Sequence, residues 1–197
     1  MDKISPKKQK YIDQAISVFK QEGLRLSLDE IAEKMGIVKK TLYNHFESKD
    51  DLLHECMQSS INELRNKIEV MNDDRFNAVE GMRKGFEEMS RAFYALSPVF
   101  FHDIKKLYPE MAMAEHHATI GLFSDKIVGN LNKGIKEQLY REDMDVALMS
   151  QYFIYSVFGF FINRVIKSNE FSAKDYFPTV LEYNLRALVS EKGAKFL

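Results

Sequence analysis

Helical spacing of apolar residues continues along almost the whole chain, and this feature limits the possible fold more than any other. Between Ile12 and Phe19, for example, apolar residues recur at the spacing of an amphipathic helix. No segment keeps the two-residue alternation of a half-buried strand, and no Asn-Gly or Asp-Gly hairpin turn occurs. The sequence therefore predicts an all-α fold.

Two short helices joined by a glycine turn are expected near the N-terminus. Ser27 is followed three residues later by Glu30, a capping-box pattern that predicts a helix start. Gly36 ends that helix because it can adopt the positive φ that a tight turn needs. A further helix is predicted from about Lys39, so about three residues separate the two helices. This spacing is typical of a helix-turn-helix.

The segment from Leu26 to Leu53 resembles the DNA-binding signature of the TetR family. The matching residues are Ile31, Ala32, Gly36, Ile37, Thr41, Leu42, Tyr43, Phe46, Ser48, Lys49 and Leu52. The resemblance implies a three-helix helix-turn-helix DNA-binding domain in residues 1–53, with a fourth helix from about 49 to 70 that connects it to the rest. A larger helical ligand-binding and dimerisation domain is expected in residues 54–197.

The resemblance also implies which residues contact DNA. Thr41 and Tyr43 offer hydroxyls to phosphates, and Lys49 adds a cation at the start of the fourth helix. Base reading then falls to the exposed residues of the short helix, since lysine can bond to guanine and asparagine to adenine. The predicted DNA-binding residues are Lys39, Lys40, Thr41, Tyr43, Asn44, His45 and Lys49. The expected partner is a palindromic double-stranded DNA operator.

Val38 departs from the pattern, because the family usually has Ser or Thr at the cap of the recognition helix. Valine has no oxygen to accept the free N–H groups of the first turn. This departure and the net charge of −1 favour an alternative function, a helical ligand-binding or protein-interaction module that has lost DNA binding. Tyr43, Lys49 and the pair Lys39-Lys40 favour a DNA-binding regulator instead.

Aromatic residues and methionines gather between residues 86 and 123. The TetR family commonly encloses a small-molecule pocket in its C-terminal domain, which implies a small hydrophobic effector here. The predicted ligand-binding residues are Phe86, Phe93, Tyr94, Phe100, Phe101, His102, Tyr108, Met111, Met113, His116 and Phe123. For any single member of this set, packing in an ordinary core is the alternative.

The two last predicted helices are the most apolar of the chain, and the resemblance implies a homodimer formed through them. The predicted interface residues are Val146, Met149, Phe153, Val157, Phe161, Leu181, Leu185 and Leu188, and a monomer core is the alternative. Residues 146–163 carry no charge, yet the polar side chains within this stretch argue against a membrane span. Asp143 is the expected cap of that helix.

No pattern of catalytic, cofactor-binding or metal-binding residues stands out. The chain has no His-x-x-x-His or Cys-x-x-Cys pair, no phosphate-binding glycine loop and no Gly-x-Ser-x-Gly segment. His102-Asp103 is an isolated dipeptide that we expect at the surface. The single cysteine, Cys56, and the lack of a secretory signal predict a cytoplasmic protein.

The predicted function is a dimeric, sequence-specific, DNA-binding transcriptional regulator. By resemblance to the family, we expect a repressor that a small hydrophobic ligand releases from its operator. No enzymatic activity, cofactor or metal ion is expected.

Overall fold

The computed structural model describes residues 5–94, 98–159 and 173–197, and these residues contain helices but no β-strand. The predicted all-α fold is confirmed. The described residues form two compact units. The N-terminal unit combines Met1–Glu63 with Ala95–His116, and the C-terminal unit combines Leu64–Tyr94 with His117–Leu197. The segment Ala95–His116 from the middle of the chain thus belongs to the same unit as the N-terminal helices.

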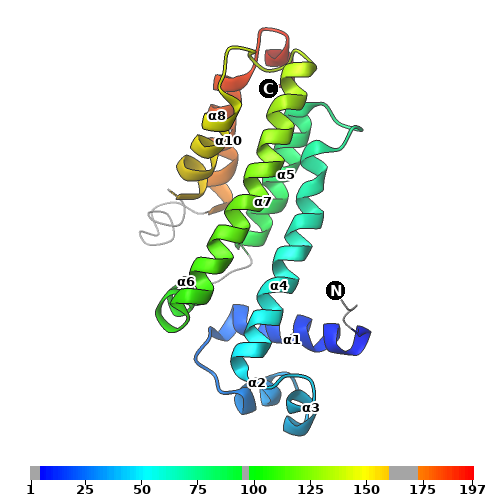
Figure 1. Cartoon of the computed structure of the whole chain (residues 1–197), viewed down its shortest axis with the longest axis vertical. Helices are drawn as coiled ribbons and strands as arrows, with labels where there is room; N and C mark the ends of the chain where they lie inside the picture. The colour runs from blue at the N-terminus through cyan, green and yellow to red at the C-terminus, as the bar shows by residue number, and fades with distance from the viewer. Residues whose placement is uncertain (1–4, 95–97, 160–172) are drawn as a thin grey trace. The chain divides into compact units, whose positions relative to one another are not determined.

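Among its described residues, the N-terminal unit combines complete helices with the first parts of longer ones (Figure 1). The complete helices are α1 (Pro6–Glu22), α2 (Leu28–Lys34), α3 (Lys39–Tyr43) and α6 (Pro98–Leu107), and the longer ones are α4 (Lys49–Ile68) and α7 (Pro109–Lys136). Local sequence determines several of their starts. Ser5 accepts a hydrogen bond from the backbone of Lys8 at the start of α1, and Pro6 and Pro109 occupy first helical positions.

One apolar core holds the N-terminal unit together. Residues from α1, α2, α3 and α4 meet in it, and Ile104 of α6 joins them. The fully buried members with the largest side chains are Ile12, Phe19, Leu24, Ile31, Leu42, Phe46, Leu52 and Leu53. Because these side chains come from all four N-terminal helices, the core fixes the angle at which α3 is held.

The C-terminal unit is built on α5 and α10, which pack against each other, with α7 and α8 beside them. Its elements are the end of α4, η1 (Glu69–Asn72), α5 (Ala78–Tyr94), most of α7, α8 (Val146–Phe153), the π-helix η2 (Ile154–Gly159), α10 (Ala173–Leu188) and η4 (Gly193–Phe196). Its core includes Met82, Phe86, Phe123, Ile127, Leu131, Phe153, Phe177 and Leu185.

A buried polar group fastens the start of α5 to α7. The side-chain amide of Asn130 donates hydrogen bonds to the carbonyl oxygens of Met71 (2.7 Å) and Ala78 (3.0 Å). The hydroxyl of Tyr140 lies 3.0 Å from the amide oxygen of Asn130. Burial raises the pKa of Tyr140 well above its ordinary value, so the hydroxyl keeps its proton and can donate.

The uncharged segment begins differently from the prediction. Asp145, not Asp143, caps α8, because its carboxylate accepts a hydrogen bond from the backbone of Leu148 at 3.0 Å. Asp143 instead pairs with Arg141 at 2.8 Å. The α-helix ends at Phe153 and continues as the π-helix to Gly159. Among the described residues, no helix has the length and apolar character needed to cross a bilayer.

Candidate nucleic-acid interface

The turn between α2 and α3 has the geometry of a helix-turn-helix. The predicted capping box is confirmed, since Ser27 and Glu30 exchange side-chain and backbone hydrogen bonds. After α2, Gly36 adopts a φ of +66°, which a residue with a side chain rarely does. The backbone N–H of Ile37 donates to the carbonyl of Ala32 at 3.0 Å and closes the turn. The chain then enters α3 at Lys39.

The predicted DNA-binding residues divide into an exposed and a half-buried group. Lys39, Lys40, Tyr43 and Asn44 are exposed, and Thr41, His45 and Lys49 are half-buried. The ring of His45 lies 5.1 Å from that of Tyr11 and 6.4 Å from that of Phe46, so it is packed against aromatic neighbours. The exposed group comes entirely from α3 and the residue that follows it. This short helix therefore presents a polar, partly cationic surface on an apolar support.

Asp29 of α2 contacts two of the exposed residues. Its carboxylate accepts a hydrogen bond from the ammonium of Lys39 and one of 3.4 Å from the hydroxyl of Tyr43. The hydrogen bond to Asp29 raises the pKa of Lys39, which is therefore fully charged at neutral pH. Both partners of this ion pair are largely exposed to solvent. An external acceptor can therefore compete with Asp29 for the lysine.

Lys49 points into the N-terminal unit. Its ammonium donates a hydrogen bond to the carbonyl of Leu24 and lies 5.8 Å from the centre of the Tyr108 ring. Burial lowers the pKa of Lys49, although the carboxylates of Asp50 and Asp103 oppose this shift. An ammonium has three donors, so the bond to Leu24 leaves others for an external anion.

Asp103 of α6 also contacts the turn that follows α1, which contains Leu24. Its carboxylate accepts hydrogen bonds from the backbone N–H of Leu24 (3.0 Å) and from Nε of Arg25 (3.2 Å). Gly23 has a φ of +79°, and a Cβ atom there would lie 2.8 Å from this carboxylate. The expectation that Asp103 lies at the surface is wrong, because its side chain is only 1% exposed. Sequence reasoning missed it because its partners lie 78 and 79 residues away.

The predicted ligand-binding residues are found in both units. Phe100, Tyr108 and Met111 are partly buried and pack against the core of the N-terminal unit, and His102 and Met113 are exposed. In the C-terminal unit Phe86 and Phe123 are buried, and the ring of Phe86 lies edge-on to that of Phe153 at 5.9 Å. The side chains of Phe93, Tyr94, Phe101 and His116 lie outside the described residues.

The predicted dimer residues lie mostly inside the chain's own core. Phe153, Val157, Leu181, Leu185 and Leu188 are buried, Val146 and Met149 are half-buried, and Phe161 lies outside the described residues. The buried members are covered by their own chain and offer no surface to a second one. The same helices expose a different set of apolar side chains, Leu148, Tyr152, Tyr155 and Tyr183.

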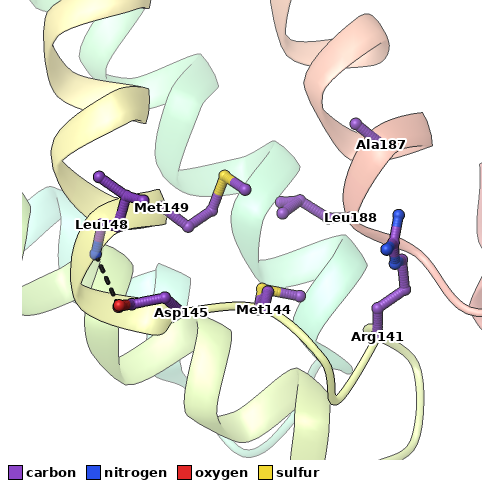
Figure 2. A pocket seen from close by; sticks show the side chains of 7 residues that line it. All are labelled: Arg141, Met144, Asp145, Leu148, Met149, Ala187 and Leu188. Atoms are coloured by element: carbon purple, nitrogen blue, oxygen red, sulfur yellow. Dashed lines mark hydrogen bonds between the residues drawn. The ribbon is translucent and has the colours of Figure 1, made fainter.

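A small open pocket lies between the start of α8 and the end of α10 (Figure 2). It is lined by Arg141, Met144, Asp145, Leu148, Met149, Ala187 and Leu188. Figure 2 shows the side chains of Met149 and Leu188 pointing toward each other across it. Asp145 caps α8. Apart from Arg141, the other residues that line the pocket are apolar.

A metal site and a reactive thiol each place requirements on the described residues. In the described part of the chain, no three His, Cys, Asp or Glu side chains are grouped so as to hold a metal ion. Burial raises the pKa of the Cys56 thiol well above its ordinary value, which disfavours the reactive thiolate.

Comparison with known proteins links this geometry to a family. The model of the DNA-binding region of "Bacterial regulatory proteins, tetR family" matches residues 12–56. The HTH-type transcriptional repressor KstR2 of Rhodococcus jostii is 24% identical over 152 residues, which cover 75% of this chain and 74% of that protein. The regulator IcaR of the Staphylococcus aureus biofilm operon icaADBC is 29% identical over 137 residues, 67% of each chain.

Solved structures show the same fold over nearly the whole chain. The fatty acid degradation regulator FadR from Bacillus halodurans superposes with a TM-score of 0.73 at 19% identity, covering 93% of this chain and 97% of that one. The TetR family regulator PfmR from Thermus thermophilus gives a TM-score of 0.65 at 23% identity, covering 90% and 97%. The matched residues 12–56 contain the whole helix-turn-helix described above. The chain therefore carries the DNA-binding domain of the tetR family of bacterial regulatory proteins in residues 12–56.

Proposed function

We propose that this protein is a homodimeric transcriptional repressor that binds a palindromic DNA operator through α3. The observation that carries this proposal is the exposed polar surface of Lys39, Lys40, Tyr43 and Asn44 on a helix whose inner side is fully buried. A short helix of this kind enters the major groove of DNA, where its side chains reach base edges. Its relatives KstR2 and IcaR are named as a repressor and a negative regulator of transcription.

The contacts divide by chemistry. Lys39, Lys40 and Asn44 are proposed to read bases, because lysine can bond to guanine and asparagine to adenine. Thr41, Tyr43 and Lys49 are proposed to bind phosphates, which position the protein without carrying sequence information. His45 is half-buried beside Tyr11 and is a weaker candidate for either role.

The dimer is proposed to form through the outward faces of α8, η2 and α10. Leu148, Tyr152 and Tyr155 follow one another at helical spacing and are 66%, 55% and 62% exposed. Tyr183 of α10 is 70% exposed. Aromatic side chains are enriched at protein interfaces, where tyrosine buries its ring and keeps a partner for its hydroxyl. A dimer also supplies the second recognition helix that one short α3 needs for selectivity.

The effector is proposed to be a small hydrophobic molecule bound in the C-terminal unit. Phe86, Phe123 and Phe153 provide an aromatic interior, and an apolar molecule that enters there has to rearrange the contact between Phe86 and Phe153. Such a regulator acts in the bacterial cytoplasm, where the DNA is.

Selection of genomic DNA tests the proposal directly. Full-length protein is mixed with sheared genomic fragments, and the bound fragments are sequenced and titrated. We expect a palindromic site bound at least about 1,000-fold more tightly than random DNA. Thermal-shift screening of hydrophobic compounds, followed by operator titration with each hit, tests release by the effector.

The alternative is a helical module that has lost DNA binding. The missing side-chain cap of α3 and the pairing of Lys39 and Tyr43 with Asp29 favour it. Under this alternative, hydrophobic compounds stabilise the protein, but no fragment is enriched in the genomic selection.

A further inference from the structure

Val38 is an apolar residue held in an exposed position where the surrounding surface is polar. It is 71% exposed, more than any other large apolar residue in the described part of the chain. It is the N-cap of α3, and its side chain makes no capping hydrogen bond. Its neighbours Lys39 and Lys40 are exposed as well. The side chain therefore contributes neither to the core nor to the start of the helix.

The backbone at Val38 is nonetheless well fixed. Val38 is extended, with φ of −70° and ψ of 133°, and its carbonyl accepts a hydrogen bond of 2.8 Å from the backbone of Thr41. The preceding Ile37 packs against the core and closes the interhelical turn through Ala32. A β-branched side chain also has little rotational freedom about χ1. The two methyl groups of Val38 are thus presented in a defined direction.

The position of Val38 suggests a role in reading DNA. In a helix-turn-helix, the N-terminal residues of the recognition helix contact base edges in the major groove. The C5-methyl group of thymine is the apolar feature that bases expose there, and apolar side chains recognise it by contact. We propose that Val38 is a specificity-determining residue that packs against a thymine methyl group in each operator half-site. This inference rests on the proposed function, because it requires α3 to enter the major groove.

The neighbouring contacts are consistent with this role. Asp29 draws Lys39 and Tyr43 toward α2, and the side chain of Val38 stays open to solvent beside them. A serine or threonine at this position would cap the helix and offer a hydroxyl to a phosphate. Valine can do neither. It instead offers an apolar contact, and in the major groove only a base pair that contains thymine has a methyl group to meet it.

The test replaces thymine by deoxyuridine, which removes only the methyl group. The full-length protein is titrated with the operator obtained from genomic selection, in which each thymine pair related by the palindrome is replaced in turn. For the wild type we expect one position per half-site at which replacement weakens binding by about fourfold for each methyl removed. The Val38→Ala variant is expected to lose this sensitivity and to bind the unmodified operator as weakly as the wild type binds the modified one.

Two matched variants serve as controls. Val38→Ile keeps a branched apolar side chain and should keep the preference for thymine. Val99→Ala makes the same truncation at an exposed valine of α6 and should leave both affinity and thymine preference unchanged. Because both valines are exposed, neither alanine variant should alter the thermal unfolding midpoint appreciably.

The possible failures are distinguishable. If an operator is found but no thymine replacement separates the wild type from Val38→Ala, the role of Val38 is refuted while the proposed function stands. The same holds if Val38→Ala keeps the full preference for thymine. If the genomic selection enriches no fragment, the proposed function fails, and the role of Val38 fails with it.

Discussion

The carboxylate of Asp103 lies 3.0 Å from the backbone nitrogen of Leu24, and this buried hydrogen bond ties α6 to the turn that follows α1. The carbonyl of the same residue, Leu24, accepts a hydrogen bond from Lys49 at the start of α4. One turn is thus held by two charged side chains from distant parts of the sequence. The position of α2, and through the helix-turn-helix that of α3, depends on this arrangement.

Asp103→Ala should destabilise the protein by about 1–3 kcal/mol, because it leaves the buried N–H of Leu24 without an acceptor. Unfolding by urea, followed by circular dichroism, measures the change. Glu33→Ala removes an exposed carboxylate of α2 and is the matched control, with an expected change within about 0.5 kcal/mol. Equal stabilities of the two variants would show that the hydrogen bond does not contribute.

The contribution of Asp103 should also depend on pH. Burial by itself raises the pKa of this carboxyl, but the hydrogen bonds from Leu24 and Arg25 outweigh it and lower the pKa below the ordinary 3.8. A carboxyl whose pKa is lower in the folded state stabilises the protein above its unfolded-state pKa. This contribution is lost as the pH falls through the folded-state pKa.

Urea titrations of the wild type and Asp103→Asn at several pH values test this dependence. The difference in the free energy of unfolding should be constant near neutrality and shrink below about pH 4. Asparagine does not titrate, so the other carboxyls cancel in the comparison. A difference that stays constant down to about pH 2 would mean that the ionised form of Asp103 is not favoured by folding.

Lys49→Ala should weaken binding to the operator and to random DNA alike, since phosphates carry no sequence information. If its ammonium neutralises one phosphate, the slope of log affinity against log salt concentration should fall in magnitude by about 0.9. Loss of the hydrogen bond to Leu24 should also lower stability by about 1 kcal/mol. Lys136→Ala, at an exposed lysine of the C-terminal unit, is the control. A lower stability with an unchanged salt slope would make Lys49 a structural residue only.

Asn44→Ala should relax base preference at defined positions without changing the salt slope. Asn44 is exposed directly after α3, and asparagine pairs with adenine in the major groove through two hydrogen bonds. Titration against operators with single base-pair changes should show that about 1–3 kcal/mol of discrimination is lost at one position of each half-site. A uniform loss of affinity over all operators would instead assign Asn44 to phosphate binding.

The sequence was sufficient to predict the helix-turn-helix, because the signals there are local. The Ser27–Glu30 capping box and the turn at Gly36 each depend on residues a few positions apart, and the structure contains both. The role of Asp103 could not be predicted, since its partners are distant in sequence and its burial results from packing. The cap of α8 was assigned to Asp143 because either of two nearby aspartates could start that helix, and only the structure distinguishes Asp145.

The dimer residues illustrate a second limit of sequence reasoning. In a helix that is apolar on every side, periodicity does not tell which face points inward. In the uncharged segment of α8 and η2, the prediction selected Phe153 and Val157, and the structure places both in the core. The exposure of Tyr152, Tyr155 and Tyr183 on α8, η2 and α10 is evident only once the inner face is known.

Tyr152→Arg should separate the proposed dimer into folded monomers. Tyr152 is 55% exposed between Leu148 and Tyr155, and an arginine there would place like charges at a two-fold interface. Leu185→Arg should unfold the protein instead, since Leu185 is fully buried. Light scattering and circular dichroism at micromolar concentration distinguish the two results. Tyr152→Phe keeps the ring and should remain dimeric.

If Tyr152→Arg keeps the dimeric mass, the interface lies elsewhere. If it becomes monomeric with unchanged helical content, its operator affinity should fall steeply, because the two recognition helices then no longer act together on half-sites about 34 Å apart.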